Sequence, residues 1–327
     1  MDAALRRKWT AAGLRRIWGA AALLLFITAA LMWFLRQPPP VTANAAVPLP
    51  RVNRLCFSPE RGTRYLAAAL SDGRVRLWDT TTRGELPVKL RSQWPLNDLA
   101  WASDGLTLFV GGFEEHVLTW NVKTNRSSTL KKFAAPVVSV ALRPQRPELL
   151  VSLANGELWW LDLSAAEREI VKSGHTGIVK MVRYHPDGKS FVTGGADQQL
   201  VWHDAVTRAV SQTVAAHQHE IGSLAFSRDG TQLVTGSWDN TARVWQAGLT
   251  EPVATLTHPD GVATVAWRAS DIVTTCWDGR LRIWNVTSGQ VIREQPCRSD
   301  SLACDIWPGR SGIAEVSTSG DLLLDPP

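Results

Sequence analysis

Residues 221–246 read IGSLAFSRDGTQLVTGSWDNTARVWQ, which is three short apolar segments separated by two polar turns. Asp229-Gly230 closes the first segment and Asp239 opens the turn before the third, and such residues favour the backbone conformations of tight hairpins. Apolar and polar residues alternate within the segments, which is typical of strands with one buried face. The stretch therefore predicts three antiparallel β-strands, and EPVATL (251–256) predicts a fourth.

The same pattern recurs along the chain at a period near forty residues. Six copies end in SDGRVRLWD (71–79), FEEHVLTWN (113–121), ANGELWWLD (154–162), ADQQLVWHD (196–204), WDNTARVWQ (238–246) and WDGRLRIWN (277–285), and a degraded seventh is STSGDLLLD (317–325). A repeat of this length with four short strands is the unit of a β-propeller blade. The 16 tryptophans, against two tyrosines, fit one repeated structural position.

These repeats resemble those of the WD-repeat β-propellers. The resemblance rests on Trp78-Asp79, Trp120-Asn121, Trp284-Asn285, Gly174-His175 and the turn aspartates Asp72, Asp197, Asp239 and Asp278. It implies an all-β, seven-bladed WD-repeat β-propeller over residues 41–327. The seventh copy has no fourth strand, and the family's way of closing the ring implies that residues 41–49 supply it.

The resemblance also implies a hydrogen-bonded network of His, Ser or Thr, Asp and Trp within a blade. The expected residues are His217, Thr235, Asp239 and Trp245 in the fifth blade, and His175, Thr193 and Asp197 in the fourth, where His203 replaces Trp. Asn155 and Leu161 replace two members in the third blade, and Glu114 replaces one in the second. These residues are expected to be structural, since each occurs where the family needs it for folding.

The N-terminus has the pattern of a membrane anchor. Residues 17–35 (IWGAAALLLFITAALMWFL) carry no charge and would span ~28 Å as a helix. Five basic residues precede this run and only Arg36 closely follows it, which keeps the N-terminus cytoplasmic under the positive-inside rule. The sequence predicts a basic cytoplasmic segment (1–16), a transmembrane helix (17–35), a Pro-rich spacer (36–40) and a propeller outside the cytoplasm, in the periplasm if the source is bacterial.

Other interpretations of the N-terminus stay open. Ala43-Asn44-Ala45 fits a signal-peptide cleavage site, and Arg15-Arg16 a twin-arginine export signal. A cytoplasmic propeller on a membrane scaffold is a further alternative.

Composition argues against several functional classes. The net charge of +5 comes from residues 1–37, which hold six basic residues and one acidic residue, so the remainder carries 29 of each. We therefore expect no nucleic-acid partner. His217-Gln218-His219-Glu220 is a weak metal pattern because His217 already has a structural role, so no metal and no cofactor are predicted. Cys297 and Cys304 are compatible with either a disulfide or two free thiols.

Aromatic residues at the loops are the candidate binding residues. Phe113, Trp238 and Trp277 precede the turn between the second and third strands (b and c), and Trp94 lies in a loop from a fourth strand to the next first strand (d to a). The resemblance places these loops on one face, which usually binds partners, and large aromatics suit interfaces, although packing between blades is the alternative. The expected function is a membrane-anchored platform for membrane-associated protein partners, a scaffold or adaptor without catalytic activity or a small-molecule substrate. The alternative is a propeller enzyme or small-ligand sensor that uses the central channel.

Overall fold

A computed structural model describes residues 50–59, 64–165, 167–246, 248–297, 303–306, 312–316 and 322–324. The chain divides into Met1–Pro48, which lies outside the described residues, and Leu49–Pro327, which contains every strand. All regular elements in the described part are β-strands.

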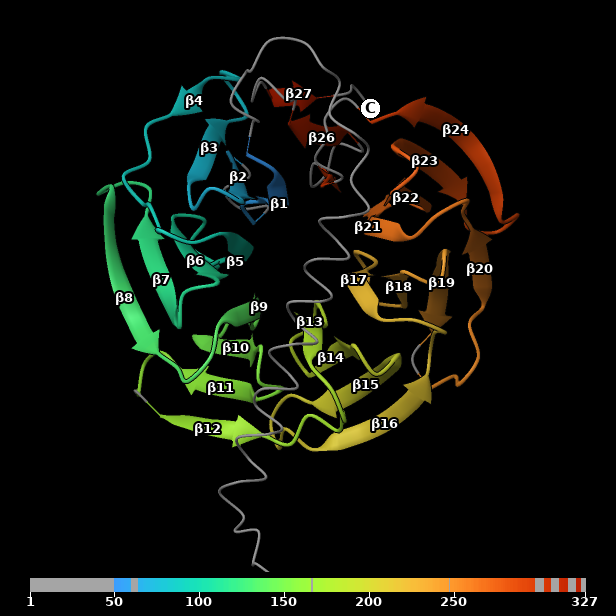
Figure 1. Cartoon of the computed structure of the whole chain (residues 1–327), viewed down its shortest axis with the longest axis horizontal. Coiled ribbons are helices and arrows are strands. Elements are labelled where there is room, and N and C mark those ends of the chain that lie inside the picture. The colour runs from blue at the N-terminus through green and yellow to red at the C-terminus, as the bar shows by residue number, and fades with distance from the viewer. Residues whose placement is uncertain are drawn as a thin grey trace, which may run out of the picture. The chain divides into compact units, whose positions relative to one another are not determined.

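Six four-stranded antiparallel sheets follow one another along the chain (Figure 1). We number these blades one to six and letter their strands a to d from the innermost outward. Blades one to three consist of β1 (Val52–Phe57), β2 (Tyr65–Leu70), β3 (Val75–Asp79), β4 (Glu85–Leu86); β5 (Leu96–Trp101), β6 (Thr107–Gly112), β7 (His116–Asn121), β8 (Arg126–Lys132); β9 (Val137–Leu142), β10 (Glu148–Leu153), β11 (Leu158–Asp162) and β12 (Arg168–Val171). Blades four to six consist of β13 (Val179–Tyr184), β14 (Ser190–Gly195), β15 (Gln199–Asp204), β16 (Val210–Ala215); β17 (Ile221–Phe226), β18 (Gln232–Ser237), β19 (Thr241–Gln246), β20 (Ala254–Thr257); β21 (Val262–Arg268), β22 (Asp271–Cys276), β23 (Arg280–Asn285) and β24 (Gln290–Pro296).

A three-stranded sheet lies between blades six and one. It consists of β25 (Asp305–Ile306), β26 (Ile313–Val316) and β27 (Leu322–Leu324). On one side, Ala303 and Ala314 share an apolar cluster with Leu55 of blade one, and on the other, Cys304 and Ile313 share one with blade six. The Phe57 N–H also donates to the Asp305 carboxylate at 3.0 Å. The sheet therefore completes the circle of strands seen in Figure 1.

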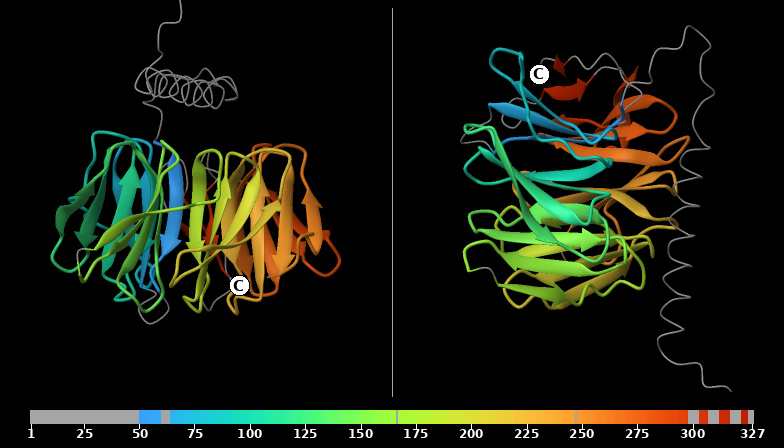
Figure 2. Two further views of the ribbon diagram at one scale, coloured as in Figure 1. Left: turned by 90° about the horizontal axis from the view of Figure 1, so that it is seen from below. Right: turned by 60° about the vertical axis from the view of Figure 1, so that its left-hand side comes forward.

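Apolar residues fill the space between neighbouring blades. The indoles of Trp78, Trp120 and Trp245 are fully buried, each on the third strand of its blade. The strands run between two loop-bearing faces of the ring, which Figure 2 shows edge-on in its left view. This burial of strand faces against the next blade is the propeller's hydrophobic core.

The structure confirms an all-β propeller and corrects the expected blade count. The prediction of seven blades preceded by a transmembrane helix is wrong: six repeats form complete four-stranded blades, and the described residues include no helix. Within the described residues, the seventh repeat contributes only the three short strands β25, β26 and β27. Residues 41–49, expected to add its outer strand, lie outside the described residues.

The predicted membrane localisation is also corrected. Within the ranges that the structure describes, no helix is long and apolar enough to cross a bilayer. The segments predicted as cytoplasmic (1–16), transmembrane (17–35) and spacer (36–40) lie outside those ranges.

Candidate functional site

One face of the propeller carries all four candidate aromatics. Because consecutive strands of a blade are antiparallel, the b–c turns and the d–a connections emerge at the same face. We call it the b–c face. Phe113, Trp238 and Trp277 lie in b–c turns, and Trp94 lies in the d–a connection from β4 to β5.

Trp94 and Phe113 are held beside each other on blade two. The Phe113 N–H donates to the carbonyl of Pro95, the residue after Trp94, at 2.9 Å. The Trp94 N–H donates to the Ser92 hydroxyl at 2.9 Å, and that hydroxyl lies 2.7 Å from the Glu114 carboxylate. Trp94 remains 58% exposed and Phe113 37% exposed. The backbone under these aromatics is therefore fixed, while the rings are open to solvent.

Trp238 and Trp277 are half-buried in neighbouring blades. Gly261 connects them: its carbonyl accepts the Trp277 N–H at 2.9 Å, and a Cβ at this position would lie 3.1 Å from the Trp277 ring and 3.4 Å from the Trp238 Cα. The Trp238 ring stacks on His219, and the Arg51 guanidinium lies over Trp277 at 5.9 Å from the ring centroid. These two indoles are thus engaged within the protein to a larger extent than Trp94, and their binding role stays a prediction.

In blade five the four expected network residues form one hydrogen-bonded chain. His217 Nδ1 lies 2.9 Å from the Asp239 carboxylate and His217 Nε2 lies 2.7 Å from the Thr235 hydroxyl. The Trp245 indole N–H donates to the same hydroxyl at 2.9 Å. One tautomer satisfies every group: Nδ1–H donates to Asp239, and the Thr235 O–H donates to Nε2. Burial lowers the pKa of His217, although Asp239 opposes the shift.

Blade four contains the expected variant of this chain. His175 contacts Asp197 and Thr193, each at 2.8 Å, and His203 Nε2 lies 3.2 Å from the Thr193 hydroxyl. If the Thr193 O–H donates to His175 Nε2, as Thr235 does to His217, then His203 Nε2–H donates to the Thr193 hydroxyl. His203 Nδ1 is then unprotonated. Among the described residues that nitrogen is buried with no hydrogen-bond partner, while the ring stacks on Phe191 at 4.3 Å. Burial lowers the pKa of His203 to about 4.

Blade six holds a network that the sequence did not reveal. His258 Nε2 lies 2.8 Å from the Thr274 hydroxyl, which also accepts the Trp284 indole N–H at 2.9 Å. His258 Nδ1 contacts the Leu256 carbonyl at 3.0 Å instead of an aspartate, because Asp278 pairs with Arg282 at 2.5 Å. Burial lowers the pKa of His258 to about 4. The similar spacing of His and Thr could have revealed this network: His258 precedes Thr274 by 16 residues, and the corresponding distance in blades four and five is 18 residues.

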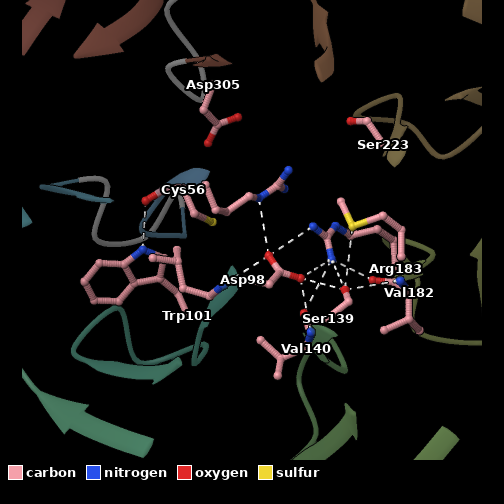
Figure 3. A network of polar contacts seen from close by, with 12 residues as sticks. Cys56, Asp98, Trp101, Ser139, Val140, Val182, Arg183, Ser223 and Asp305 are labelled. Carbon is pink, nitrogen blue, oxygen red and sulfur yellow. Dashed lines mark hydrogen bonds and ion pairs between the residues drawn. The ribbon is translucent and has the colours of Figure 1, made fainter. Parts of the chain in front are cut away.

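A second unforeseen network joins the innermost strands of blades one to four (Figure 3). Asp98 is 2% exposed and accepts hydrogen bonds from the Ser139 hydroxyl at 2.6 Å and the Val140 N–H at 3.1 Å. Arg183 donates to it at 3.0 Å, and Arg54 Nε lies 3.5 Å away. Burial alone would raise the pKa of Asp98, but the two guanidiniums lower it below its usual value. The available signal was the polar residue at the third position of strand a in repeats one to three: Arg54, Asp98 and Ser139.

The polar groups of these networks form hydrogen bonds inside the protein. The Thr235 hydroxyl, which a triad would use as nucleophile, is buried and already accepts an indole N–H. Within the described ranges, no group of three His, Cys, Asp or Glu side chains is placed to hold a metal ion. His219, the second residue of the weak metal pattern, stacks on Trp238. The four cysteines are free thiols, and burial raises the pKa of Cys276 to about 11.

Comparison with known proteins agrees with the repeat pattern. Residues 48–79, 168–204, 209–246 and 250–285 match the family model "WD domain, G-beta repeat". The last three stretches each comprise the outer strand of one blade and the inner three strands of the next. Each sequence repeat thus links two blades. Blades two and three, whose networks depart from the family pattern, have no match over their first three strands.

Curated relatives are WD-repeat proteins of greater length. The chain is 27% identical over 202 residues to actin-interacting protein 1 of Drosophila melanogaster, and 28% identical over 203 residues to WD repeat-containing protein 1 of Gallus gallus. These matches cover 58% and 59% of this chain, and 33% of each relative. Cell division cycle 20.1, cofactor of APC complex, of Arabidopsis thaliana is 26% identical over 185 residues, covering 53% of this chain and 39% of the relative.

The chain spans about a third of the length of the first two relatives. The matched repeats and the relatives show that the chain contains WD repeats similar to those of WD-repeat proteins, and the structure arranges its repeats as a β-propeller.

Proposed function

We propose that this propeller is a protein-interaction platform, a scaffold or adaptor, that presents its b–c face to partner proteins and makes or breaks no bond. The observation that carries the proposal is the exposure of Trp94, 58%, on a backbone fixed by Ser92 and Glu114. A large aromatic on a rigid support loses little conformational entropy on binding and buries a large apolar area. Such residues are typical anchors of protein interfaces.

The relatives support a protein as the partner. One is named for its interaction with actin and another as a cofactor of the APC complex. Those names describe the relatives, and for this chain they favour the general class of protein partner over a small-molecule substrate. The absence of catalysis is argued from the buried hydroxyls of Thr235 and Thr274, whose hydrogen bonds lie inside the blades.

The four aromatics divide into two candidate anchor sites. Trp94 and Phe113 form the more open one, and Trp238 and Trp277 form a half-buried one in blades five and six. We propose the first as the primary anchor and the second as an additional contact.

Affinity capture with the tagged full chain tests the proposal. Proteins retained by the wild type should fall at least tenfold in recovery with Trp94→Ala/Phe113→Ala, since truncation of anchors of this size costs about 2 kcal/mol or more. The control is Ile170→Ala/Ile292→Ala, which removes two equally exposed apolar side chains from outer strands β12 and β24. Equal recovery with all three proteins, at equal melting temperature, contradicts the proposal, as does turnover of a substrate by the purified chain.

A further inference from the structure

We infer that the surface formed by Arg74, Arg91, Trp94 and Phe113 binds a short acidic peptide segment of the partner, which inserts one apolar or aromatic residue against Trp94. The inference rests on the proposed function and adds the chemistry of the partner. We call these four residues the blade-two surface.

The first step is that the loop before blade two is locked onto the b–c turn of blade one. Arg74 and Arg91 form an antiparallel β-bridge, and the Ser92 N–H donates to the Gly73 carbonyl at 2.8 Å. Gly73 has a φ of 81°, and a Cβ there would lie 2.3 Å from the Ser92 carbonyl oxygen. Only glycine allows this close approach, which brings Arg74, Arg91 and Trp94 to one place.

The second step is that the bridge sets two guanidinium-bearing residues opposite each other. Like charges directly opposite in a ladder are unfavourable. Arg74 is compensated by Asp72, whose carboxylate lies 2.6 Å from its Nε. Arg91 is exposed, and its side chain has no hydrogen bond or ion pair within the described residues. A carboxylate from a partner would relieve the repulsion and give Arg91 its counter-ion.

The third step is that the acidic side chains of this region are already occupied. Glu114 accepts hydrogen bonds from the Ser92 hydroxyl and the Gln93 N–H and pairs with His116, while Glu115 pairs with Lys132. No further carboxylate of these two b–c turns is therefore available to Arg91. The surface combines one uncompensated cation with two exposed aromatic rings.

The fourth step selects a peptide over a nucleic acid. A polynucleotide needs a row of basic groups along its backbone, and the chain beyond residue 37 carries equal numbers of basic and acidic residues. One free arginine beside a rigid tryptophan matches one or two carboxylates next to a single apolar side chain. Arginine and carboxylate can also pair through two parallel hydrogen bonds, which gives directional recognition.

Selection from a display library of random 12-residue peptides on the full-length protein tests the inference. We expect enriched peptides to carry Asp or Glu next to an aromatic or aliphatic residue. A fluorescein-labelled copy of the most enriched peptide should bind at least tenfold more weakly to Trp94→Ala and to Arg91→Glu. Its copy with amides in place of the acids should bind at least tenfold more weakly to the wild type. Lys172→Glu makes the same charge change in an exposed d–a connection of blade three and should leave the Kd within twofold.

Three outcomes overturn the inference. They are enriched peptides without acidic excess, a Kd that Arg91→Glu leaves unchanged, and displacement of the peptide by an equal concentration of oligo-dT. If the peptide instead loses affinity only with Trp238→Ala/Trp277→Ala, the blade-two surface is wrong while the proposed function stands. The proposed function itself is tested separately, by protein capture with Trp94→Ala/Phe113→Ala and by the assay for turnover.

Discussion

Arg183 on blade four donates a hydrogen bond to the carboxylate of Asp98 on blade two at 3.0 Å, across the width of blade three. The Ser139 hydroxyl of blade three donates to the same carboxylate oxygen at 2.6 Å, and Arg183 also reaches that hydroxyl at 3.2 Å. Non-adjacent blades are therefore connected through a buried charge on the innermost strands. Such a connection fixes the relative position of three consecutive sheets.

Asp98→Asn should destabilise the propeller strongly. The amide cannot neutralise Arg183 and Arg54, which lie 3.0 and 3.5 Å from the carboxylate. Breaking a buried ion pair by removing one partner costs about 3–5 kcal/mol. We expect a loss of that order in the free energy of unfolding, measured by urea denaturation.

Glu115→Gln is the matched control for this loss. Its carboxylate is 48% exposed and lies 3.6 Å from Lys132, so the expected change is less than about 1 kcal/mol. Equal effects of the two variants would show that the Asp98 network contributes no more than a surface pair.

The repeat spacing predicted the six complete blades because the eighth-position residue of each copy is structural. Trp78, Trp120 and Trp245 stand at that position and are fully buried. The same reasoning overestimated the seventh copy, where a turn signal and three leucines persist but the described residues form only three short strands. A turn motif fixes the geometry of one hairpin, but it does not show whether another segment of the chain adds a fourth strand to the sheet.

The candidate site was only partly predictable for a related reason. The b–c turn position located Phe113, Trp238 and Trp277, yet solvent exposure depends on the neighbouring blade, and Gly261 and Arg51 belong to other segments. Contacts of the Asp98 network join residues 41 to 85 positions apart, from four different repeats. No periodicity within one repeat reports such contacts.

Acid should weaken the fold through two buried histidines. The pKa values of His203 and His258 are lowered by burial to about 4. The unfolded chain, with histidine pKa near 6.5, binds more protons between these values, so stability is full above pH 6.5 and falls towards pH 4. Each histidine should cost about 2 kcal/mol at pH 5 relative to pH 7.5. Urea midpoints at the two pH values measure the loss.

Two glutamine variants separate this effect from general acid sensitivity. His203→Gln removes one of the buried histidines whose pKa is lowered and should reduce the pH-dependent loss by about 2 kcal/mol. His219→Gln changes an exposed histidine of the b–c face and should leave the loss unchanged. A loss of the same size in His203→Gln and the wild type would contradict the assignment.

We expect the substitution of His203 by Trp to be tolerated only when Phe191 is replaced by a smaller residue at the same time. Elsewhere the eighth-position Trp faces an aliphatic residue on strand b: Leu66 with Trp78, Leu108 with Trp120, Leu233 with Trp245 and Ile272 with Trp284. In blade four the larger Phe191 faces the smaller His203. His203→Trp alone overfills the site and should cost about 1–3 kcal/mol. Phe191→Leu/His203→Trp should be at least as stable as the wild type, because the indole can donate to Thr193 and the unpartnered Nδ1 is removed.

A double-mutant cycle in urea unfolding measures this coupling. We expect the sum of the losses in unfolding free energy of the two single variants to exceed the loss of the double variant by about 0.5–3 kcal/mol. Additive effects would show that Phe191 does not compensate for His203.

Thr274→Val should destabilise blade six although the change is nearly isosteric. The hydroxyl lies between the His258 imidazole at 2.8 Å and the Trp284 indole N–H at 2.9 Å, and all three groups are buried. Its removal leaves an unsatisfied donor and an unsatisfied acceptor, at a cost of about 1–3 kcal/mol. Thr274→Ser keeps the hydroxyl and should lose less than Thr274→Val, although it removes a methyl group. In hydrogen-exchange measurements, the backbone amides that exchange faster in Thr274→Val should lie in β21–β24. A Thr274→Val variant as stable as Thr274→Ser would mean that this hydrogen-bonded chain does not stabilise the blade.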